Sequence, residues 1–490
     1  MLKNESLFFT EEETQQDEMH EACGVFGIYG DESLDVARLV YSGLYALQHR
    51  GQESCGIAVT DSEGAITGHK GMGLVAEAFT EKALDRLEGT LAIGHTRYST
   101  TGGNTIENCQ PLIVNYRDGR LALAHNGNLV NAWRIRGEME NTGAIFQTAT
   151  DSEVIANLIS RNGLKCRDLE EALIKTMEVI EGSFALILMT RNKLIGIRDP
   201  WGLRPLCLGK VGDAYVLASE SCALDVVGAE FIRDVKPGEI VIIDGGEPRS
   251  VMGISGRPHR LCLLEHIYFA RPDSFIDGAS IYESRLEAGK LLAIQHPVDA
   301  DVVVGVPDSG LTAAIGFSRQ SGIPYGEALI KNRYVGRTFI QPNQKQREQS
   351  VNIKLNALRA EVYGKRIVLI DDSLVRGTTT KKIVQMLKNA GAKEIHMRIS
   401  SPPIKFPCYF GIDTPSRQQL IAANHSVDEI RDIICADSLG YLSVEDIVKT
   451  PIGAPKDSFC TACFTGEYPM VVPEEADKFS LDNKCESLHD

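Results

Sequence analysis

The stretch VLIDDSLVRGTTTKK at residues 368–382 decides the fold of the second half of the chain. Its apolar residues predict a buried strand that ends at two adjacent carboxylates, Asp371 and Asp372. The loop that follows is rich in hydroxyl side chains and opens a predicted helix at Thr380. Such a loop places backbone N–H groups and the positive end of a helix dipole around a phosphate.

The two carboxylates can hold ribose hydroxyls or a Mg²⁺ ion, which takes oxygen ligands. The spacing GxxxxGK[ST] is absent, so the loop is not a P-loop. An ordinary strand-to-helix turn with Asp and Thr as turn and cap residues is the alternative. Paired acids at the carboxyl end of a parallel strand favour a binding site, because α/β sheets bind ligands there.

The same order of strand, loop and helix occurs nearby in the sequence. Residues 301–307 predict a strand and 311–318 a helix, and 366–370 and 380–390 repeat the pattern. Continuous Val and Ile runs between helices predict a buried parallel sheet in a doubly wound α/β domain. The loop between the first strand and helix, Pro307-Asp308-Ser309-Gly310, can present backbone groups to a pyrophosphate.

The whole chain is acidic, with 490 residues and a net charge of −15. This charge argues against broad binding to nucleic acid or to an anionic membrane. A polyanionic ligand therefore needs a local basic patch, and Lys331, Arg333 and Arg337 supply one. Taken alone, that stretch would be a solvated surface loop.

The first 22 residues differ from the rest, since they carry −6 of the net charge and the remaining chain only −9. They lack the basic and apolar regions of a signal peptide, and no run in the chain nears the ~20 apolar residues of a membrane span. We expect a cytoplasmic protein. Twelve cysteines in a reducing compartment predict buried thiols, a nucleophile or cluster ligands, not a disulfide framework.

After residue 22 the pattern becomes that of packed sheets with a helical layer. Residues 34–47 have the apolar spacing of an amphipathic helix. The expected strands are 23–30, 54–59, 91–95, 121–125, 184–190 and 215–219, and two further helices are expected near 150–161 and 168–181. A domain boundary is expected near 250–260.

Cys23 stands directly after the acidic segment. If residues 1–22 are removed, its own α-amine, with a reference pKa of ~8, can serve as the base for its thiol. The alternative is a small buried hydrophobic residue at the start of a strand.

Four blocks carry a resemblance: CGVFG at 23–27, HTRYSTTG at 95–102, HNGNLVN at 125–131 and TDSE at 150–153. They resemble the N-terminal-nucleophile (Ntn-hydrolase) glutaminase domain of class II amidotransferases. The resemblance implies that Cys23 attacks glutamine, that Asn126 and Gly127 stabilise the oxyanion, and that Arg97 and Asp151 bind the substrate. The alternatives are a structural ion pair for Arg97 and a hairpin turn for Asn126-Gly127.

The paired acids with GTT resemble the phosphoribosylpyrophosphate (PRPP) signature of type I phosphoribosyltransferases. The PRPP-binding residues implied by this resemblance are Asp308, Ser309, Gly310, Lys331, Arg333, Arg337, Asp371, Asp372, Ser373, Gly377, Thr378 and Thr379. One Mg²⁺ per subunit is expected on Ser309, Asp371 and Asp372.

Both resemblances together identify the chain as similar to the amidophosphoribosyltransferases, glycosyltransferases of the first committed step of de novo purine synthesis. The expected order is a propeptide at 1–22, an αββα-sandwich glutaminase domain at 23–255, a parallel-sheet phosphoribosyltransferase domain at 256–470 and a tail at 471–490. The substrates implied are glutamine and PRPP, and the products 5-phosphoribosylamine, glutamate and pyrophosphate. Purine nucleotide feedback inhibitors and a homotetramer are implied by the resemblance alone, and neither nucleic acid nor membrane is an expected partner.

Cys460-Thr-Ala-Cys463 suits zinc, a redox pair or an iron–sulfur cluster equally well. The contexts of Cys262, Cys408, Cys460 and Cys463 match the Bacillus-like subset of the family. That match implies one [4Fe–4S] cluster per subunit, with a structural role. Cys222 and Cys435 lack the match and are expected to be core or incidental thiols.

Two rival functions stay open. A hexosamine-forming amidotransferase would share the glutaminase half, but it would need sugar-isomerase domains in place of the residues 370–379. A PRPP-binding purine regulator would carry a basic DNA-binding domain, whereas the N-terminal half here is acidic.

Overall fold

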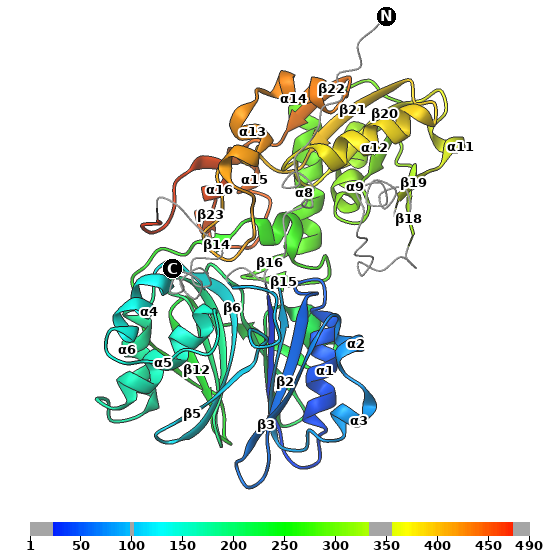
Figure 1. Ribbon diagram of the computed structural model, residues 1–490. Coiled ribbons are helices and arrows are strands. Elements are labelled where there is room, and N and C mark those ends of the chain that lie inside the picture. The colour runs from blue at the N-terminus through cyan, green and yellow to red at the C-terminus, as the bar shows by residue number, and fades with distance from the viewer. Residues whose placement is uncertain (1–22, 99–101, 333–354, 474–490) are drawn as a thin grey trace, which may run out of the picture. The chain divides into compact units, whose positions relative to one another are not determined.

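A computed structural model describes residues 23–98, 102–332 and 355–473 (Figure 1). The chain divides into two compact units. We call residues 23–284, 406–414 and 448–473 the sandwich unit, and residues 285–405 and 415–447 the parallel-sheet unit. The predicted leader, residues 1–22, lies outside the described residues, as does most of the predicted tail.

The sandwich unit contains two antiparallel sheets. The seven-stranded sheet has the order β11 (Glu230–Asp234), β9 (Cys207–Val211), β10 (Ala214–Ala218), β1 (Gly24–Tyr29), β4 (Leu91–Arg97), β2 (Ser54–Thr60) and β3 (Ile66–Met72). The six-stranded sheet has the order β13 (Arg249–Met252), β12 (Glu239–Ile243), β8 (Leu194–Arg198), β7 (Gly182–Met189), β6 (Gly119–Leu129) and β5 (Leu112–Tyr116).

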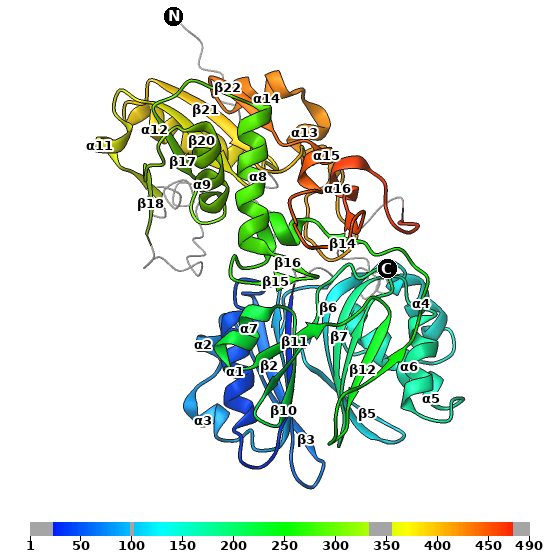
Figure 2. The same ribbon diagram turned by 180° about the vertical axis from the view of Figure 1, so that it is seen from behind.

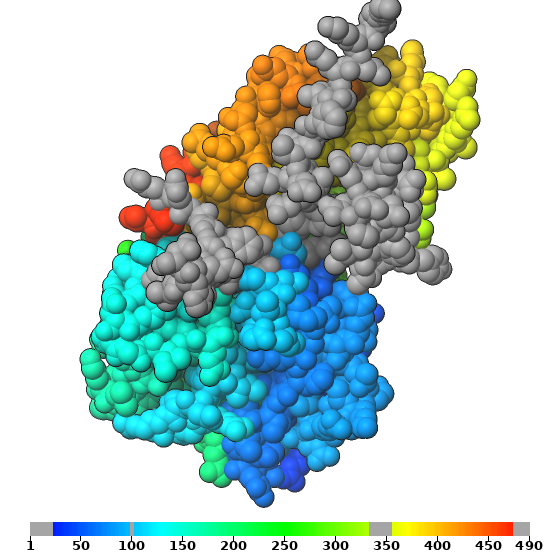
Figure 3. All heavy atoms as spheres, in the orientation of Figure 1, coloured from blue at the N-terminus to red at the C-terminus, as the bar shows by residue number. Residues whose placement is uncertain are grey.

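Helices cover the outer face of each sheet (Figure 1). The seven-stranded sheet carries α1 (Val36–Ala46), α2 (Val75–Ala78), α3 (Glu81–Leu84) and α7 (Ser221–Val226), and the six-stranded sheet carries α4 (Ala132–Glu140), α5 (Asp151–Gly163) and α6 (Leu169–Met177). The predicted αββα sandwich is confirmed. In the space-filling view, blue and cyan atoms from the first part of the chain form the surface of this unit on the side shown (Figure 3).

The alternation of side chains along β1 explains the layers. Val25 points into the core between the two sheets, whereas Phe26 and Ile28 pack under the helices. Gly43 lets α1 lie close to β1, because a Cβ there would come within 2.5 Å of the Phe26 ring. The predicted strands and helices of this half all occur, with bounds shifted by a few residues.

The parallel-sheet unit has four strands, ordered β17 (Val302–Gly305), β20 (Arg366–Asp371), β21 (Glu394–Ile399) and β22 (Ser438–Tyr441), all parallel. Helix α12 (Thr378–Asn389) packs on one face through Ile383 and Leu387. Helices α8 (Ile281–Gln295) and α9 (Gly310–Ser321) lie on the other face, as the view from behind shows (Figure 2). The predicted doubly wound parallel sheet is confirmed.

Shorter elements complete this unit. They are β18 (Leu329–Lys331) with β19 (Leu355–Ala357), α11 (Arg359–Val362), η3 (Arg417–Gln419), α13 (Ile421–Asn424), α14 (Val427–Ile433) and α15 (Val444–Ile447).

The units divide between Ser284 and Arg285, later than the expected boundary near 255. The intervening residues form β14 (Leu261–Cys262), η2 (Glu265–Phe269), β15 (Phe275–Ile276) and β16 (Ala279–Ser280), which belong to the sandwich unit. A later part of the chain also belongs to the sandwich unit: β23 (Phe459–Cys460) pairs with β14 and is followed by α16 (Ala462–Thr465). Pairing of such distant segments leaves no sign in local sequence pattern.

Among the described residues, no helix has the length and apolar character needed to cross a membrane.

Candidate functional site

Cys23 lies just before β1 at the wall of a pocket in the sandwich unit. It is buried, and its thiol donates a hydrogen bond to the carbonyl oxygen of Tyr98 at 3.3 Å. The pocket is lined by Cys23, Arg97, Tyr98, Gln110, His125, Gly127, Thr150 and Asp151. Burial raises the pKa of the Cys23 thiol, so the group is held protonated and needs a base to become a nucleophile.

Asn126 and Gly127 lie inside strand β6, so the hairpin-turn alternative is wrong. The Asn126 side chain is fully buried, and neither of its amide atoms has a hydrogen-bond partner among the described residues. A buried amide without a partner costs stability, so this amide is suited to bind a group that the described residues do not supply. Gly127 has φ = 152°, and a Cβ there would lie 2.0 Å from the carbonyl oxygen of Ser183.

Arg97 ends β4 and is 2% exposed. Its guanidinium donates to the carbonyl oxygens of Gly102 and Gly103, both at 3.3 Å. These bonds hold a planar cation at the pocket wall, in a position suited to a carboxylate.

Asp151 is the first residue of α5. Its Oδ2 accepts from the Leu129 N–H at 3.0 Å, and its Oδ1 lies 3.4 Å from Nδ1 of His125. Burial raises the pKa of the Asp151 carboxyl, but the neighbouring His125 and the N–H groups of Leu129 and Ser152 outweigh it and lower the pKa overall. The pocket therefore holds an ionised carboxylate, which suits an ammonium group.

Four of the five residues expected in the glutaminase half line this pocket, namely Cys23, Arg97, Gly127 and Asp151, and Asn126 is the neighbour of Gly127 in β6. The fold adds Tyr98, Gln110, His125 and Thr150 to the pocket, which the sequence did not assign. Gln110 supports strand β6, since its Oε1 accepts from the His125 N–H at 2.8 Å. Gln110 lies in a loop without periodic pattern, so no signal in the sequence points to it, whereas His125 stands within the quoted block 125–131.

A second constellation lies at the carboxyl edge of the parallel sheet. Strand β20 ends at Asp371, and the Asp372 N–H donates to Oδ1 of Asp371 at 3.0 Å. Two hydroxyls bind the Asp372 carboxylate, one from Ser309 at 2.5 Å and one from Ser373 at 2.6 Å. Burial raises the pKa of Asp372, while these hydroxyls and the Arg285 charge partly offset the rise.

Two helices begin at this edge. Ser309 precedes α9, whose first residue Gly310 allows close approach, because a Cβ there would lie 2.4 Å from the Ile370 carbonyl oxygen. Gly377 has φ = 83° and precedes α12, which begins with Thr378 and Thr379. Two helix N-termini beside hydroxyls and carboxylates form a site for a phosphorylated sugar with a cation.

Among the described residues, Lys331 adds positive charge to that of Arg285 at this edge. It ends β18 and makes an ion pair with the exposed carboxylate of Asp308. Arg333 and Arg337, also expected here, lie outside the described residues.

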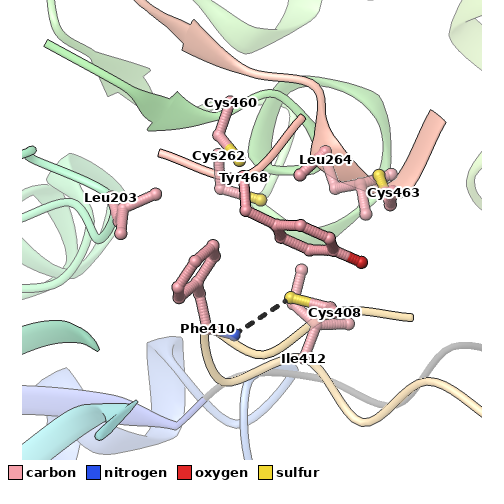
Figure 4. A pocket seen from close by; sticks show the side chains of 10 residues that line it. Leu203, Cys262, Leu264, Cys408, Phe410, Ile412, Cys460, Cys463 and Tyr468 are labelled. Carbon is pink, nitrogen blue, oxygen red and sulfur yellow. Dashed lines mark hydrogen bonds between the residues drawn. The ribbon is translucent and has the colours of Figure 1, made fainter. Parts of the chain in front are cut away.

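The four cysteines singled out in the sequence line a single pocket within the sandwich unit (Figure 4). Cys262 on β14 faces Cys460 on β23 in the strand register, and Cys463 lies in α16. Cys408 comes from the segment 406–414, and its Sγ accepts from the Phe410 N–H at 3.3 Å. The remaining lining residues are Leu203, Leu264, Phe410, Ile412, Ala462 and Tyr468.

The pocket is apolar and its thiols influence one another. Burial raises the pKa of Cys463, and the charges of Cys262, Cys460 and Cys408 raise it further. Within the described part of the chain no group of three or more His, Cys, Asp or Glu residues is arranged to hold a single metal ion, and no disulfide is formed. Four thiols at one apolar pocket are of the ligand type that soft metals and iron–sulfur clusters take.

Comparison with known proteins finds a known domain in each half of the chain. A glutamine amidotransferase domain model matches residues 95–226, and a phosphoribosyl transferase domain model matches residues 283–400. The amidophosphoribosyltransferase of Bacillus subtilis is 51% identical over 462 residues, covering 93% of this chain and 96% of the relative. That of Archaeoglobus fulgidus is 52% identical over 454 residues, covering 92% and 99%.

Solved structures agree as well. The glutamine PRPP amidotransferase of B. subtilis complexed with ADP and GMP has a TM-score of 0.87 and 49% identity, and the match covers 93% of this chain and 99% of that one. A structure described as the allosteric regulatory enzyme of purine biosynthesis has a TM-score of 0.87 and 50% identity, with coverage of 92% and 97%. With this identity along almost its whole length, the chain belongs to the amidophosphoribosyltransferase family.

Proposed function

We propose that this chain releases ammonia from glutamine at Cys23 and transfers it to PRPP at the carboxyl edge of the parallel sheet. The observation that carries the proposal is the buried Asn126 amide without a partner, next to Gly127 and in the same unit as the Cys23 pocket. The family's reaction is the first step of purine biosynthesis, and it gives 5-phosphoribosylamine, glutamate and pyrophosphate.

In the first half-reaction, Cys23 loses its thiol proton to its own α-amine once residues 1–22 have been removed. The sulfur attacks the side-chain carbonyl carbon of glutamine, and the oxyanion that forms accepts from the Asn126 amide and the Gly127 N–H. The C–N bond then breaks, the α-ammonium returns the proton, and ammonia leaves. Water hydrolyses the thioester to glutamate. Arg97 holds the substrate carboxylate and Asp151 its ammonium group.

In the second half-reaction, ammonia attacks C1 of PRPP and displaces pyrophosphate. The N-termini of α9 and α12, with Ser309, Ser373 and Gly377–Thr379, bind the phosphates. Lys331, Arg333 and Arg337 are the proposed source of positive charge for the pyrophosphate. Free ammonia is mostly protonated at neutral pH and then no longer nucleophilic, so direct transfer between the two sites preserves its reactivity.

Asp371, Asp372 and Ser309 would hold one Mg²⁺ per subunit. Their oxygen donors fit this ion, which usually takes one or two carboxylates and completes its shell with substrate phosphates and water. The ion would neutralise charge on the departing pyrophosphate.

Cys262, Cys408, Cys460 and Cys463 would hold one [4Fe–4S] cluster per subunit. The four thiols and the apolar walls of their pocket fit such a cluster. Its proposed role is structural, because it would tie β14, the segment 406–414 and α16 together within the sandwich unit.

Purine nucleotides are proposed inhibitors, since a nucleoside monophosphate shares the ribose 5-phosphate group of PRPP. A cytoplasmic homotetramer is proposed from the family, and light scattering of the purified protein measures that state.

The test is PRPP-dependent glutamate production by the purified protein, with Cys23→Ala and a matched Cys166→Ala control. We expect Cys23→Ala to abolish the glutamine-dependent activity and to keep phosphoribosylamine synthesis from ammonium salts. The control should keep both, because Cys166 lies outside the pocket. Equal loss of both activities in Cys23→Ala would contradict the division into two sites.

A further inference from the structure

Residues Phe406–Thr414, here called the Cys408 loop, belong to the sandwich unit although the parallel-sheet unit flanks them in sequence. The loop contacts strands β6 and β7 directly beside Gly127. The Asn128 side chain donates to the Tyr409 carbonyl oxygen at 3.0 Å, and the Ser183 hydroxyl donates to the Phe410 carbonyl oxygen at 2.8 Å.

Ser183 connects the loop to the backbone that follows Gly127. Its hydroxyl also accepts from the Asn128 N–H at 3.3 Å, and Ser183 and Asn128 are cross-strand partners. The Ser183 side chain is fully buried, so water does not replace these bonds. One hydroxyl therefore fixes both the loop and the peptide unit between Gly127 and Asn128.

The loop also touches Gly127 through its backbone. A Cβ at Gly411 would lie 2.9 Å from the Gly127 carbonyl carbon, and Gly411 has φ = 86°. The side chain of Arg204, which is 1% exposed, donates to the Phe410 carbonyl oxygen from its Nε at 3.1 Å. Its Nη1 lies 3.2 Å from Glu265, so the guanidinium is itself held in place.

We propose that the contacts of the Cys408 loop with β6 and β7 hold the oxyanion-binding residues in position. Ser183 and Asn128 are then positioning residues for glutamine hydrolysis. This proposal rests on the role proposed above for Gly127. An oxyanion donor works only when it is held where the charge develops, and a small displacement weakens transition-state binding. The hydrogen bonds that hold the proposed substrate-binding groups run to other segments: Arg97 donates to Gly102 and Gly103, and Asp151 accepts from the Leu129 N–H. We therefore expect the affinity for glutamine to be unchanged.

Phe410 connects this support to the cysteine pocket. Its ring lines the pocket, its N–H donates to Cys408 Sγ, and its carbonyl oxygen receives the bonds from Ser183 and Arg204 (Figure 4). A change in the position of Cys408 is therefore transmitted through one residue to β7 and Gly127.

The test compares Ser183→Ala and Asn128→Ala with Thr176→Val, which removes a buried hydroxyl of helix α6 in the same unit. We expect kcat for glutamine hydrolysis to fall at least about tenfold in the first two variants, since a misplaced oxyanion donor costs that order. KM for glutamine should stay within about twofold of the parent, because the substrate-binding charges are unchanged. Ammonia-dependent synthesis should equal that of the parent and of Thr176→Val.

A kcat in both Ser183→Ala and Asn128→Ala equal to that of Thr176→Val would overturn the proposal. A parallel fall in ammonia-dependent activity would do the same, because it would indicate general destabilisation. The Cys23→Ala variant separately tests the function proposed above. If that function is wrong, this variant will still hydrolyse glutamine, whatever the result for Ser183→Ala and Asn128→Ala.

Discussion

The Ser309 hydroxyl donates a 2.5 Å hydrogen bond to Oδ1 of Asp372 at the carboxyl edge of the parallel sheet. The two residues are 63 positions apart, and each follows a strand of the same parallel pair, β17 and β20. The bond joins the loop that precedes α9 to the acidic pair that precedes α12. The N-termini of α9 and α12 are thereby held beside one carboxylate.

We predict that Asp371→Asn combined with Asp372→Asn removes PRPP binding, because the amides no longer attract a divalent cation. Calorimetric titration of PRPP with Mg²⁺ measures the loss. Glutamine hydrolysis in the absence of PRPP is the control and should persist, since Cys23 and its pocket belong to the other unit. Unchanged PRPP affinity would contradict the assignment of the acidic pair.

The second prediction is that the active protein begins at Cys23. Burial raises the pKa of its thiol, so a base is needed at the sulfur, and a released α-amine supplies one. Intact-mass spectrometry of purified active enzyme checks this. A variant with Ala22→Pro is expected to block removal of the leader and to lose glutamine-dependent activity, with ammonia-dependent synthesis as its control. Active protein that retains Met1 would refute the prediction.

Much of this arrangement follows from local sequence. The Val/Ile runs before Asp308 and Asp371 predict parallel strands, and the position of acids and glycines at their ends predicts the ligand edge. Asn126 and Gly127 were expected in the glutaminase site, and the fold places them inside β6.

The contacts of the Cys408 loop could not be predicted. Asn128 is 281 residues from Tyr409, and Ser183 is 227 residues from Phe410. Such contacts depend on chain topology and leave no periodicity behind. The later boundary at Ser284 has the same origin, because β14 is held by pairing with the distant β23.

The third prediction concerns pH and His95, a fully buried residue of β4. Its Nε2 lies 2.9 Å from the His125 carbonyl oxygen. Burial, together with the nearby charges of Arg97, His125 and Lys70, lowers the pKa of His95 to about 3, although the bond with the His125 carbonyl oxygen opposes the shift. The unfolded chain binds the proton near pH 6.5 and the folded chain does not, so its contribution to stability is complete above pH 6.5 and is lost as pH falls toward 3.

In the parent protein, the His95 contribution makes the free energy of unfolding fall by about 1.4 kcal/mol per pH unit below pH 6. The variant His95→Gln should lack this contribution. Asp234 acts in the opposite sense, since burial raises its pKa to about 7, but it contributes equally to both proteins. Denaturant unfolding followed by tryptophan fluorescence reports on the sandwich unit, because Trp133 and Trp201 are the only two tryptophans of the chain. Parallel stability curves for the two proteins between pH 6.5 and 4.5 would rule out the role of His95.

The last prediction concerns the cysteine pocket. Anaerobically purified protein should be brown and contain about four irons per chain, the content of one [4Fe–4S] cluster. Cys460→Ser removes one of the four converging thiols, so we expect iron and the visible absorption to be lost, whereas Cys166→Ser, outside the pocket, should keep both. Exposure of the parent protein to air should release iron and inactivate glutamine hydrolysis with the same time course, because the Cys408 loop loses its anchor beside Gly127. The two time courses are measured on the same samples, iron content by colorimetric assay and activity by glutamate production. An iron-free, colourless protein with full activity would disprove the cluster.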